Sequence, residues 1–260
     1  FTLTLDVNSI RTLKITIESG ATLELNGTIG HNLGFVTGEG TLKLVSNTPS
    51  ISFPAGDYQD FFPTGACIGG GGLEYAGSGS YSILSGLSNV RRLILSGSGD
   101  RVFSNNTNVR ICENLEILGS VDALVPDGNS IITVLGNVYK SDLATFDNGG
   151  GSSKVVLEGT SLQLIAGSFT GTNAFNDLEL NNASGLTIVN SADAGRGIAA
   201  GGDIDIQSSL LFSNGIITTD AANQLRLLNL ATADNYSSTR YVNGPLIRQL
   251  APVVQSFPFP

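Results

Sequence analysis

The sequence predicts an all-β chain that winds as a right-handed parallel β-helix, a solenoid with coils of about 20–25 residues. Three observations support this prediction. The first is a set of short stretches in which apolar and polar residues alternate, and the second is the return of such stretches at near-regular intervals. The third is composition. The 260 residues include 33 glycines but no Met or Trp, and charged residues make up 13%. Sparse helix formers and frequent turn residues are typical of short strands joined by tight turns.

Ten pairs of apolar residues, whose two members are separated by one residue, mark the expected strands. The pairs are Leu23/Leu25, Leu42/Leu44, Leu73/Tyr75, Leu93/Leu95, Leu115/Ile117, Ile132/Val134, Val155/Leu157, Leu178/Leu180, Ile204/Ile206 and Leu225/Leu227. Successive pairs begin 17 to 31 residues apart, and eight of the ten middle residues are polar or charged. Each strand should therefore have one buried and one solvated face. We expect the pairs to point inward in stacked rows. We expect a spaced outer row of Glu24, Lys43, Glu74, Glu116, Glu179 and Asp205.

A single coil cannot bury its own inner face, so coils of this kind stack and form parallel sheets along one axis. Parallel crossovers are nearly always right-handed, which sets the expected winding. Glycines in the turns supply the positive φ angles needed at the corners. Tandem antiparallel β-sandwich domains are the alternative, because they show similar alternation and turns. The coil-length spacing favours the solenoid.

The expected organisation is one continuous domain. Residues 1–46 form the first coils, residues 47–72 an irregular excursion, and residues 73–260 the continuing coils. The excursion accounts for the longest interval and carries the aromatic residues Phe53, Tyr58, Phe61 and Phe62. Such insertions on a regular scaffold often bind ligands. Two interpretations stay open: the aromatic side chains fold back as a lid over the core, which we favour, or they contact a carbohydrate or a protein partner.

Charge and hydropathy exclude two classes of partner. The formal net charge is −9, whereas a nucleic-acid-binding protein needs a basic stripe. The basic doublet Arg91-Arg92 is interpreted as a solvated or ion-paired strand edge. No run of 18 apolar residues exists, so membrane insertion is not expected. For Cys67 and Cys112 we favour two buried free thiols over a disulfide. A metal site is disfavoured because the sequence has no CxxC motif and one histidine, His31.

The candidate chemical site is weak. Asp203 and Asp205 are the clearest pair of carboxylates on one strand face, and they could act as paired acids or as calcium ligands. A solvated strand face is the favoured interpretation, because no further acids accompany them. The glycine run at 69–72 fits no phosphate-binding motif and is interpreted as a turn. We therefore expect no catalytic residues, no cofactor and no resident metal, with calcium as the one cation considered.

Several stretches resemble a known class of proteins. They are "ESGATLELNG" (18–27), "GHNLGFVTGEGTLKLVSN" (30–47), "FPAGDYQDFF" (53–62), "GGLEYAGSGSYSI" (71–83), "AFNDLELNNASGLTI" (174–188) and "YVNGPLIRQL" (241–250). They resemble the large repeat-containing surface proteins of Bacteroidota, which are exported by the type IX secretion system and include gliding-motility adhesins. The resemblance covers the chain from about residue 10 onward and concerns a repeat style, not a reaction.

The resemblance implies an extracellular, cell-surface protein and a structural or adhesive role, as an extended scaffold or adhesin stalk. Its implied partners are other segments of the same long polypeptide, surface glycans, or secretion and surface-anchoring proteins. The strand pattern runs from Phe1 to Pro260, so we expect the native molecule to continue past both ends or another chain to cover them. The alternatives are a carbohydrate-active β-helix enzyme of the polysaccharide lyase or hydrolase kind, a carbohydrate-binding module, and an ice- or matrix-binding solenoid.

Overall fold

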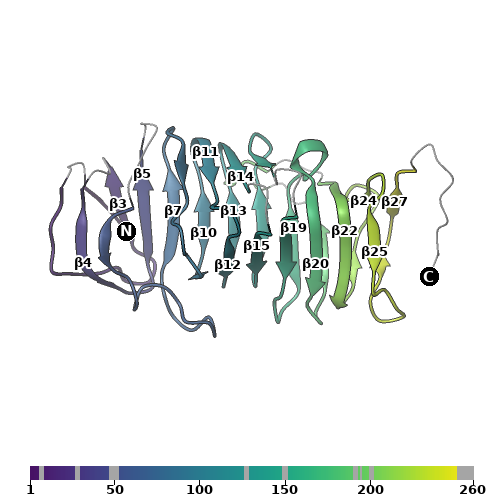
Figure 1. Cartoon of the computed structure of the whole chain (residues 1–260), viewed down its shortest axis with the longest axis horizontal. Helices are drawn as coiled ribbons and strands as arrows, with labels where there is room; N and C mark the ends of the chain where they lie inside the picture. Colours follow the sequence, from purple (N-terminus) through teal and green to yellow (C-terminus); the bar gives the residue numbers. More distant parts are fainter. Residues whose placement is uncertain are drawn as a thin grey trace.

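The computed structural model describes residues 1–5, 9–26, 30–46, 53–125, 129–147, 152–189, 193, 195–198 and 202–250. Its strands are short and stack side by side along one axis, in the order of the sequence (Figure 1). The only helical segment in this described part is the 3-10 helix η1 (Gly171–Asn173). No helix there has the length and apolar character needed to cross a membrane.

The longest sheet has eleven strands and runs the length of the stack. In spatial order they are β1 (Thr2–Leu5), β3 (Thr22–Asn26), β5 (Thr41–Val45), β7 (Gly72–Ala76), β10 (Leu93–Leu95), β13 (Leu115–Ile117), β16 (Val138–Lys140), β19 (Gln163–Ala166), β21 (Leu186–Val189), β23 (Ile217–Thr218) and β26 (Val242–Asn243). Each strand pairs in parallel with the next, so each coil contributes one strand to this sheet, which we call the long sheet.

Three further sheets complete the coils. The nine-stranded sheet holds β9 (Asn89–Val90), β12 (Asn108–Ile111), β15 (Ile131–Val134), β18 (Lys154–Leu157), β20 (Phe175–Asn181), β22 (Ile204–Asn214), β24 (Leu225–Leu227) and β27 (Leu246–Arg248), with β25 (Thr232–Asp234) beside β22. A four-stranded sheet holds β8 (Tyr81–Ser82), β11 (Ser98–Val102), β14 (Ser120–Leu124) and β17 (Thr145–Asp147). A three-stranded sheet holds β2 (Lys14–Thr16), β4 (Asn32–Thr37) and β6 (Ala55–Asp57).

The order of the strands along the chain gives the path of a coil. The first coils alternate between the long sheet and the three-stranded sheet. From β7 to β18 each coil visits the long sheet, then the four-stranded sheet, then the nine-stranded sheet. All pairs between the named strands are parallel, and the stack has about ten turns. The prediction of a parallel β-helix is therefore confirmed, and the antiparallel sandwich is wrong.

The stretch 47–72 is less irregular than expected. Residues 47–52 lie outside the described residues, but β6 forms within the stretch and pairs in parallel with β4. The chain thus completes a third strand of the small sheet before it leaves the regular coil. The true excursion is the segment 58–71, between β6 and β7.

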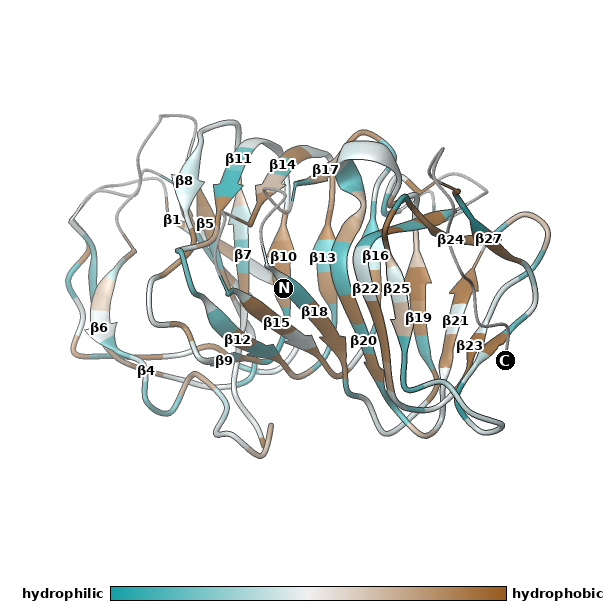
Figure 2. Ribbon diagram, turned by 45° about the vertical axis from the view of Figure 1, so that its right-hand side comes forward, coloured by the Kyte–Doolittle hydropathy of each residue, from teal (hydrophilic) through white to brown (hydrophobic). Residues whose placement is uncertain are grey.

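The core confirms the inward direction of the ten apolar pairs. All twenty residues are buried, with at most 5% of each exposed, and they belong to one continuous cluster. Figure 2 shows hydrophobic residues recurring on strand after strand along the stack. Period-two alternation places every second side chain inside the coil, and the stacked coils bury it.

The pairs nevertheless form two rows, not one series. The five pairs from Leu23/Leu25 to Leu115/Ile117 lie on the long sheet, whereas the five from Ile132/Val134 onward lie on the nine-stranded sheet. Leu115 is in register with Val138, and Ile132 with Val109. The 17-residue interval from Leu115 to Ile132 is therefore a step from one face of a coil to another.

The expected outer row divides in the same way. Lys43 lies between Glu24 and Glu74 on neighbouring strands of the long sheet, with its Nζ 3.0 and 3.7 Å from their carboxylate oxygens. Partial burial lowers the pKa of Lys43, but the two carboxylates outweigh it and hold that pKa above its usual value. Glu116 and Asp205, expected to be solvated, are buried. The first is paired with Arg196 and the second with Arg226, so both carboxylates have a cationic partner.

Two cations, Lys140 and Arg101, lie inside the stack and form no ion pair among the described residues. Lys140 is in register with the inward Ile117, and its Nζ donates hydrogen bonds to the carbonyl oxygens of Ser141 and Ala144 at 3.1 and 2.8 Å. Burial lowers the pKa of Lys140. Arg101 on β11 is fully buried and donates to five backbone carbonyl oxygens. Backbone carbonyls from the coil corners thus replace the counter-ions that buried charges need.

A pH prediction follows from Tyr81, which is buried and donates its hydroxyl hydrogen to the carbonyl oxygen of Ala76. Burial raises the pKa of Tyr81 from 10.0 to about 12, and burial also raises that of Tyr75. Because the folded state keeps these protons longer than the unfolded state, their contribution is complete below pH 10 and is lost as pH rises from 10 toward 12.

We expect the free energy of unfolding, measured by urea titration at fixed salt, to fall over that range. Tyr81→Phe should show a shallower fall. An equal slope in the variant and the parent would contradict the assignment of this pH dependence to Tyr81.

Candidate functional site

The four aromatic residues of the stretch 47–72 pack on one another at the edge of the core. The ring centroids of Phe53 and Tyr58 are 5.1 Å apart, and those of Tyr58 and Phe62 are 5.7 Å apart with the rings stacked. Phe61 is fully buried, while the other three are half-buried against the core cluster. The Tyr58 hydroxyl donates to the carbonyl oxygen of Pro54 at 2.9 Å.

This packing agrees with a lid of aromatic side chains over the core. Burial raises the pKa of Tyr58, so its hydroxyl keeps its proton to a higher pH than that of a solvated tyrosine. Phe61 has no surface to offer a ligand. A contact between a carbohydrate or protein partner and the exposed parts of Phe53, Tyr58 and Phe62 stays a prediction.

A disulfide ties the excursion to the solenoid. Cys67 lies in the excursion and Cys112 directly follows β12, 45 residues later, and the two are bonded with their Cα atoms 5.4 Å apart. Both residues are half-buried. The expectation of two buried free thiols is therefore wrong. The excursion folds back against a coil that lies two strands further along the long sheet, and the spacing in sequence does not show this.

Removal of the disulfide should destabilise the chain. A cross-link over 45 residues restricts the unfolded chain, and such bonds contribute about 2–4 kcal/mol. We expect the double variant Cys67→Ser/Cys112→Ser to lose about that much free energy of unfolding, measured in urea. A reductant should lower the stability of the parent and leave the double variant unchanged. Mass spectrometry shows whether the reductant has reduced both thiols of the parent. If the reduced parent unfolded at the same urea concentration as the oxidised parent, this prediction would be contradicted.

Asp203 and Asp205 share one cationic partner. Arg226 Nε lies 2.6 Å from Asp205 Oδ1, and Arg226 Nη1 lies 3.3 Å from Asp203 Oδ2. Asp205 is buried and also accepts a hydrogen bond from the backbone N–H of Gly171. The hydrogen bond that Arg226 donates to Asp205 and the charge of both carboxylates hold the pKa of Arg226 above its usual value. The two acids are thus brought together as expected, but a guanidinium group already lies between them.

The structure also places the other residues that were considered as a chemical or metal site. His31 is buried, and its Nδ1 accepts a hydrogen bond from the backbone N–H of Ile10 at 3.3 Å. Within the described ranges, no three or more His, Cys, Asp or Glu side chains gather in a way that could hold a metal ion. Binding of calcium, the one cation considered above, at Asp203 and Asp205 stays a prediction.

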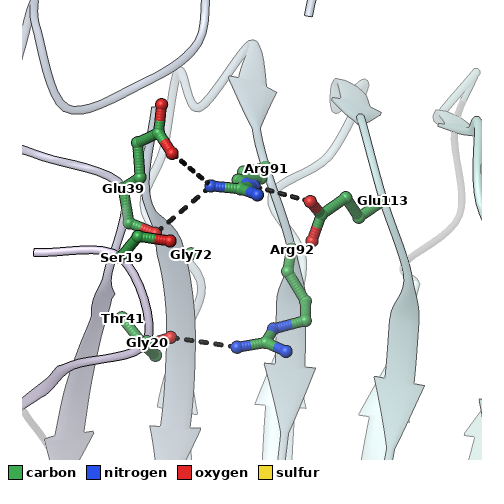
Figure 3. A pocket seen from close by; sticks show the side chains of 8 residues that line it. All are labelled: Ser19, Gly20, Glu39, Thr41, Gly72, Arg91, Arg92 and Glu113. Atoms are coloured by element: carbon green, nitrogen blue, oxygen red, sulfur yellow. Dashed lines mark hydrogen bonds and ion pairs between the residues drawn. The ribbon is translucent and has the colours of Figure 1, made fainter. Parts of the chain in front are cut away.

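A polar pocket lies where the chain turns into the long sheet. It has a volume of about 180 Å³ and is lined by Ser19, Gly20, Glu39, Thr41, Gly72, Arg91, Arg92 and Glu113 (Figure 3). These residues stand just before or at the start of successive strands of the long sheet, so the pocket spans several coils. We call it the arginine pocket.

The two arginines of the pocket have different surroundings. Arg91 Nε lies 2.6 Å from Glu113 Oε1, and Arg91 Nη1 lies 3.2 Å from Glu39 Oε2. The hydrogen bond to Glu113 is the largest cause that holds the pKa of Arg91 above its usual value. Arg92 donates one hydrogen bond, from Nη2 to Thr41 Oγ1 at 3.1 Å, and its Nε is buried without a partner. The pocket therefore holds one arginine that is paired with two carboxylates and one that has no ion pair among the described residues.

The sequence interpretation of the basic doublet holds for one of the two arginines of this pocket. Arg91 is ion-paired at a strand edge, as expected for the basic doublet, but Arg92 has no ion pair in the described part of the chain. The glycine run at 69–72 was a usable signal. Gly72 stands at a strand position where Thr41 and Arg92 flank it, and the missing side chain leaves the space.

Comparisons of the chain with protein-family models, with curated proteins and with solved structures found no match.

Proposed function

We propose that the chain is a structural, adhesive β-solenoid segment of a large secreted bacterial cell-surface protein, acting as an extended scaffold or adhesin stalk. The observation that carries this proposal is the use of its charged side chains. Ion pairs join neighbouring coils at Lys43 with Glu24 and Glu74, at Lys154 with Glu179, and at Arg226 with Asp205. These charged side chains are distributed along the stack and pair across neighbouring coils, an arrangement expected of a scaffold.

The cell-surface location and type IX export are supported by the resemblance described above. The proposed partners are other segments of the same polypeptide, surface glycans and surface-anchoring proteins. An antibody against this chain should label intact cells of the organism that produces it. Brief treatment of those cells with an external protease should remove the signal. A signal that resists the protease and appears only after lysis would overturn the surface location.

We also propose that the chain is not an enzyme, because the one pair of carboxylates considered is occupied by Arg226. The purified protein should form no product from a panel of uronate-containing and neutral polysaccharides. Reducing ends and unsaturated sugars are the two products to measure, since hydrolases form the first and lyases form both. Turnover that disappears in Asp203→Asn or Asp205→Asn would overturn the scaffold proposal.

A further inference from the structure

The arginine pocket exists because one side chain is missing from an otherwise regular row. Thr41, Gly72 and Arg92 are neighbours in register on β5, β7 and next to β10. A Cβ atom added to Gly72 would lie 3.4 Å from Thr41 Oγ1 and 3.5 Å from Arg92 Cβ. Arg92 reaches across the place of this absent side chain to Thr41 (Figure 3). Gly72 has no positive φ angle, so its backbone conformation does not require glycine.

The pocket has two ends of different character. Figure 3 shows Glu39, Arg91 and Glu113 in a row at one end, and Arg92 extending away from them toward Thr41 and Gly20. The first end is rich in carboxylate oxygens that accept hydrogen bonds. At the second end, Arg92 carries a charge that no described carboxylate neutralises and a buried Nε–H without an acceptor. Such a donor is costly unless a ligand or water satisfies the group.

We propose that the arginine pocket binds a uronate, a sugar residue with one carboxylate and several hydroxyl groups. The carboxylate would lie at Arg92, because guanidinium groups recognise carboxylates through charge-assisted hydrogen bonds. The hydroxyls would lie toward Glu39 and Glu113, whose oxygens accept hydrogen bonds, and toward Ser19. This inference goes beyond the scaffold role and does not depend on it.

The size and lining of the pocket favour a single sugar over an acidic peptide. Its volume of about 180 Å³ is below the roughly 300–1,000 Å³ of sites that enclose drug-sized ligands. None of the lining residues carries an aliphatic or aromatic side chain. An Asp or Glu side chain would satisfy Arg92 but bring methylene groups to a polar wall and leave Glu39 and Glu113 without new donors. A uronate satisfies both ends.

Titration of the ¹⁵N-labelled protein with galacturonate and with glucuronate tests this, with NMR shifts of Gly20 and Gly72 as the local readout. Galactose, glucose, acetate and an Asp-rich peptide are the comparison ligands. We expect weak binding of at least one uronate, with a Kd of about 1–10 mM, because a small ligand makes few contacts. A uronate oligomer distinguishes a polysaccharide from a free sugar acid as the source. Binding of either form supports the proposal.

Three variants sharpen the test. Arg92→Gln removes the charge, and Gly72→Val fills the pocket without backbone strain, so each should weaken uronate binding at least about tenfold. Arg110→Gln is the matched control, since Arg110 pairs with Glu158 on the nine-stranded sheet and lies outside the pocket. Melting curves identify a variant that fails to fold, and the other pocket variant then decides. Three results would each overturn the proposal. The first is the absence of saturable shifts with either uronate, and the second is equal binding of neutral sugars, acetate or the peptide. The third is uronate binding that neither pocket variant changes.

Discussion

Replacing Leu180 with Asp is expected to lower the free energy of unfolding by at least about 4 kcal/mol. Leu180 is fully buried on β20, in register with Leu157 on one side and Phe212 on the other. The carboxylate would enter the inner row with no cationic partner, and the lost methyl groups would leave a cavity between stacked coils. Each coil is stabilised by its contacts with neighbouring coils, so the substitution should also destabilise the coils on either side.

Urea titration followed by circular dichroism measures this loss. The matched control is Thr133→Asp, because Thr133 faces outward on the same sheet, in register with Arg110 and Val156. The control should change stability by no more than about 0.5–1 kcal/mol. If Leu180→Asp unfolded at the same urea concentration as Thr133→Asp, the inward row on the nine-stranded sheet would be wrong.

Replacing Arg101 with Met should lower the free energy of unfolding by about 3–5 kcal/mol, the range found when one member of a buried charged network is removed and its partners stay buried. Arg101 donates to the carbonyl oxygens of Tyr75, Gly77, Gly79, Ser96 and Asp100. These carbonyls lie at or beside the corners of two successive coils, so the side chain joins one coil to the next. Its Cζ also lies 4.2 Å from the ring centroid of Tyr81. Methionine keeps much of the volume and loses every donor.

Two further variants separate the donors from the charge. Arg101→Lys keeps the charge but has three N–H donors and lacks the planar, forked guanidinium group. Its free energy of unfolding should therefore lie between that of the parent and that of Arg101→Met. Arg110→Met removes an arginine of the partly exposed Arg110–Glu158 pair and should cost less than about 1 kcal/mol. Equal urea midpoints for Arg101→Met and Arg110→Met would show that the buried network does not hold the corners.

Local periodicity was sufficient to predict that the ten apolar pairs face the core. The alternation at Leu23-Glu24-Leu25 sets the direction of each side chain by strand geometry alone, wherever the strand lies in the coil. For the same reason it could not tell one sheet from another. Leu115-Glu116-Ile117 and Ile132-Thr133-Val134 have the same pattern, yet they lie on different faces of the coil. The sheet to which a strand belongs depends on corner geometry, which a period-two pattern does not contain.

The features missed by the sequence interpretation depend on contacts that a period-two pattern does not contain. Lys140 and Arg101 look like outward strand residues, because their partners are backbone carbonyls that carry no sequence signal. Cys67 meets Cys112 only after the excursion folds back. The arginine pocket depends on the absence of a side chain at Gly72 between two flanking coils.

The central claim is that the chain forms parallel coils whose strands divide into separate sheets, and engineered cysteine pairs test it most directly. Thr133 is in register with Val156, and Glu116 with Tyr139, whereas Glu116 and Thr133 lie on different sheets. Neighbouring strands are about 4.8 Å apart, within reach of a disulfide. The measurement is mass-spectrometric mapping of disulfides after mild oxidation, with Cys67–Cys112 retained. The account predicts cross-links in the 133/156 and 116/139 double variants and none in the 116/133 variant. A cross-link between 116 and 133, or none between 133 and 156, would contradict it.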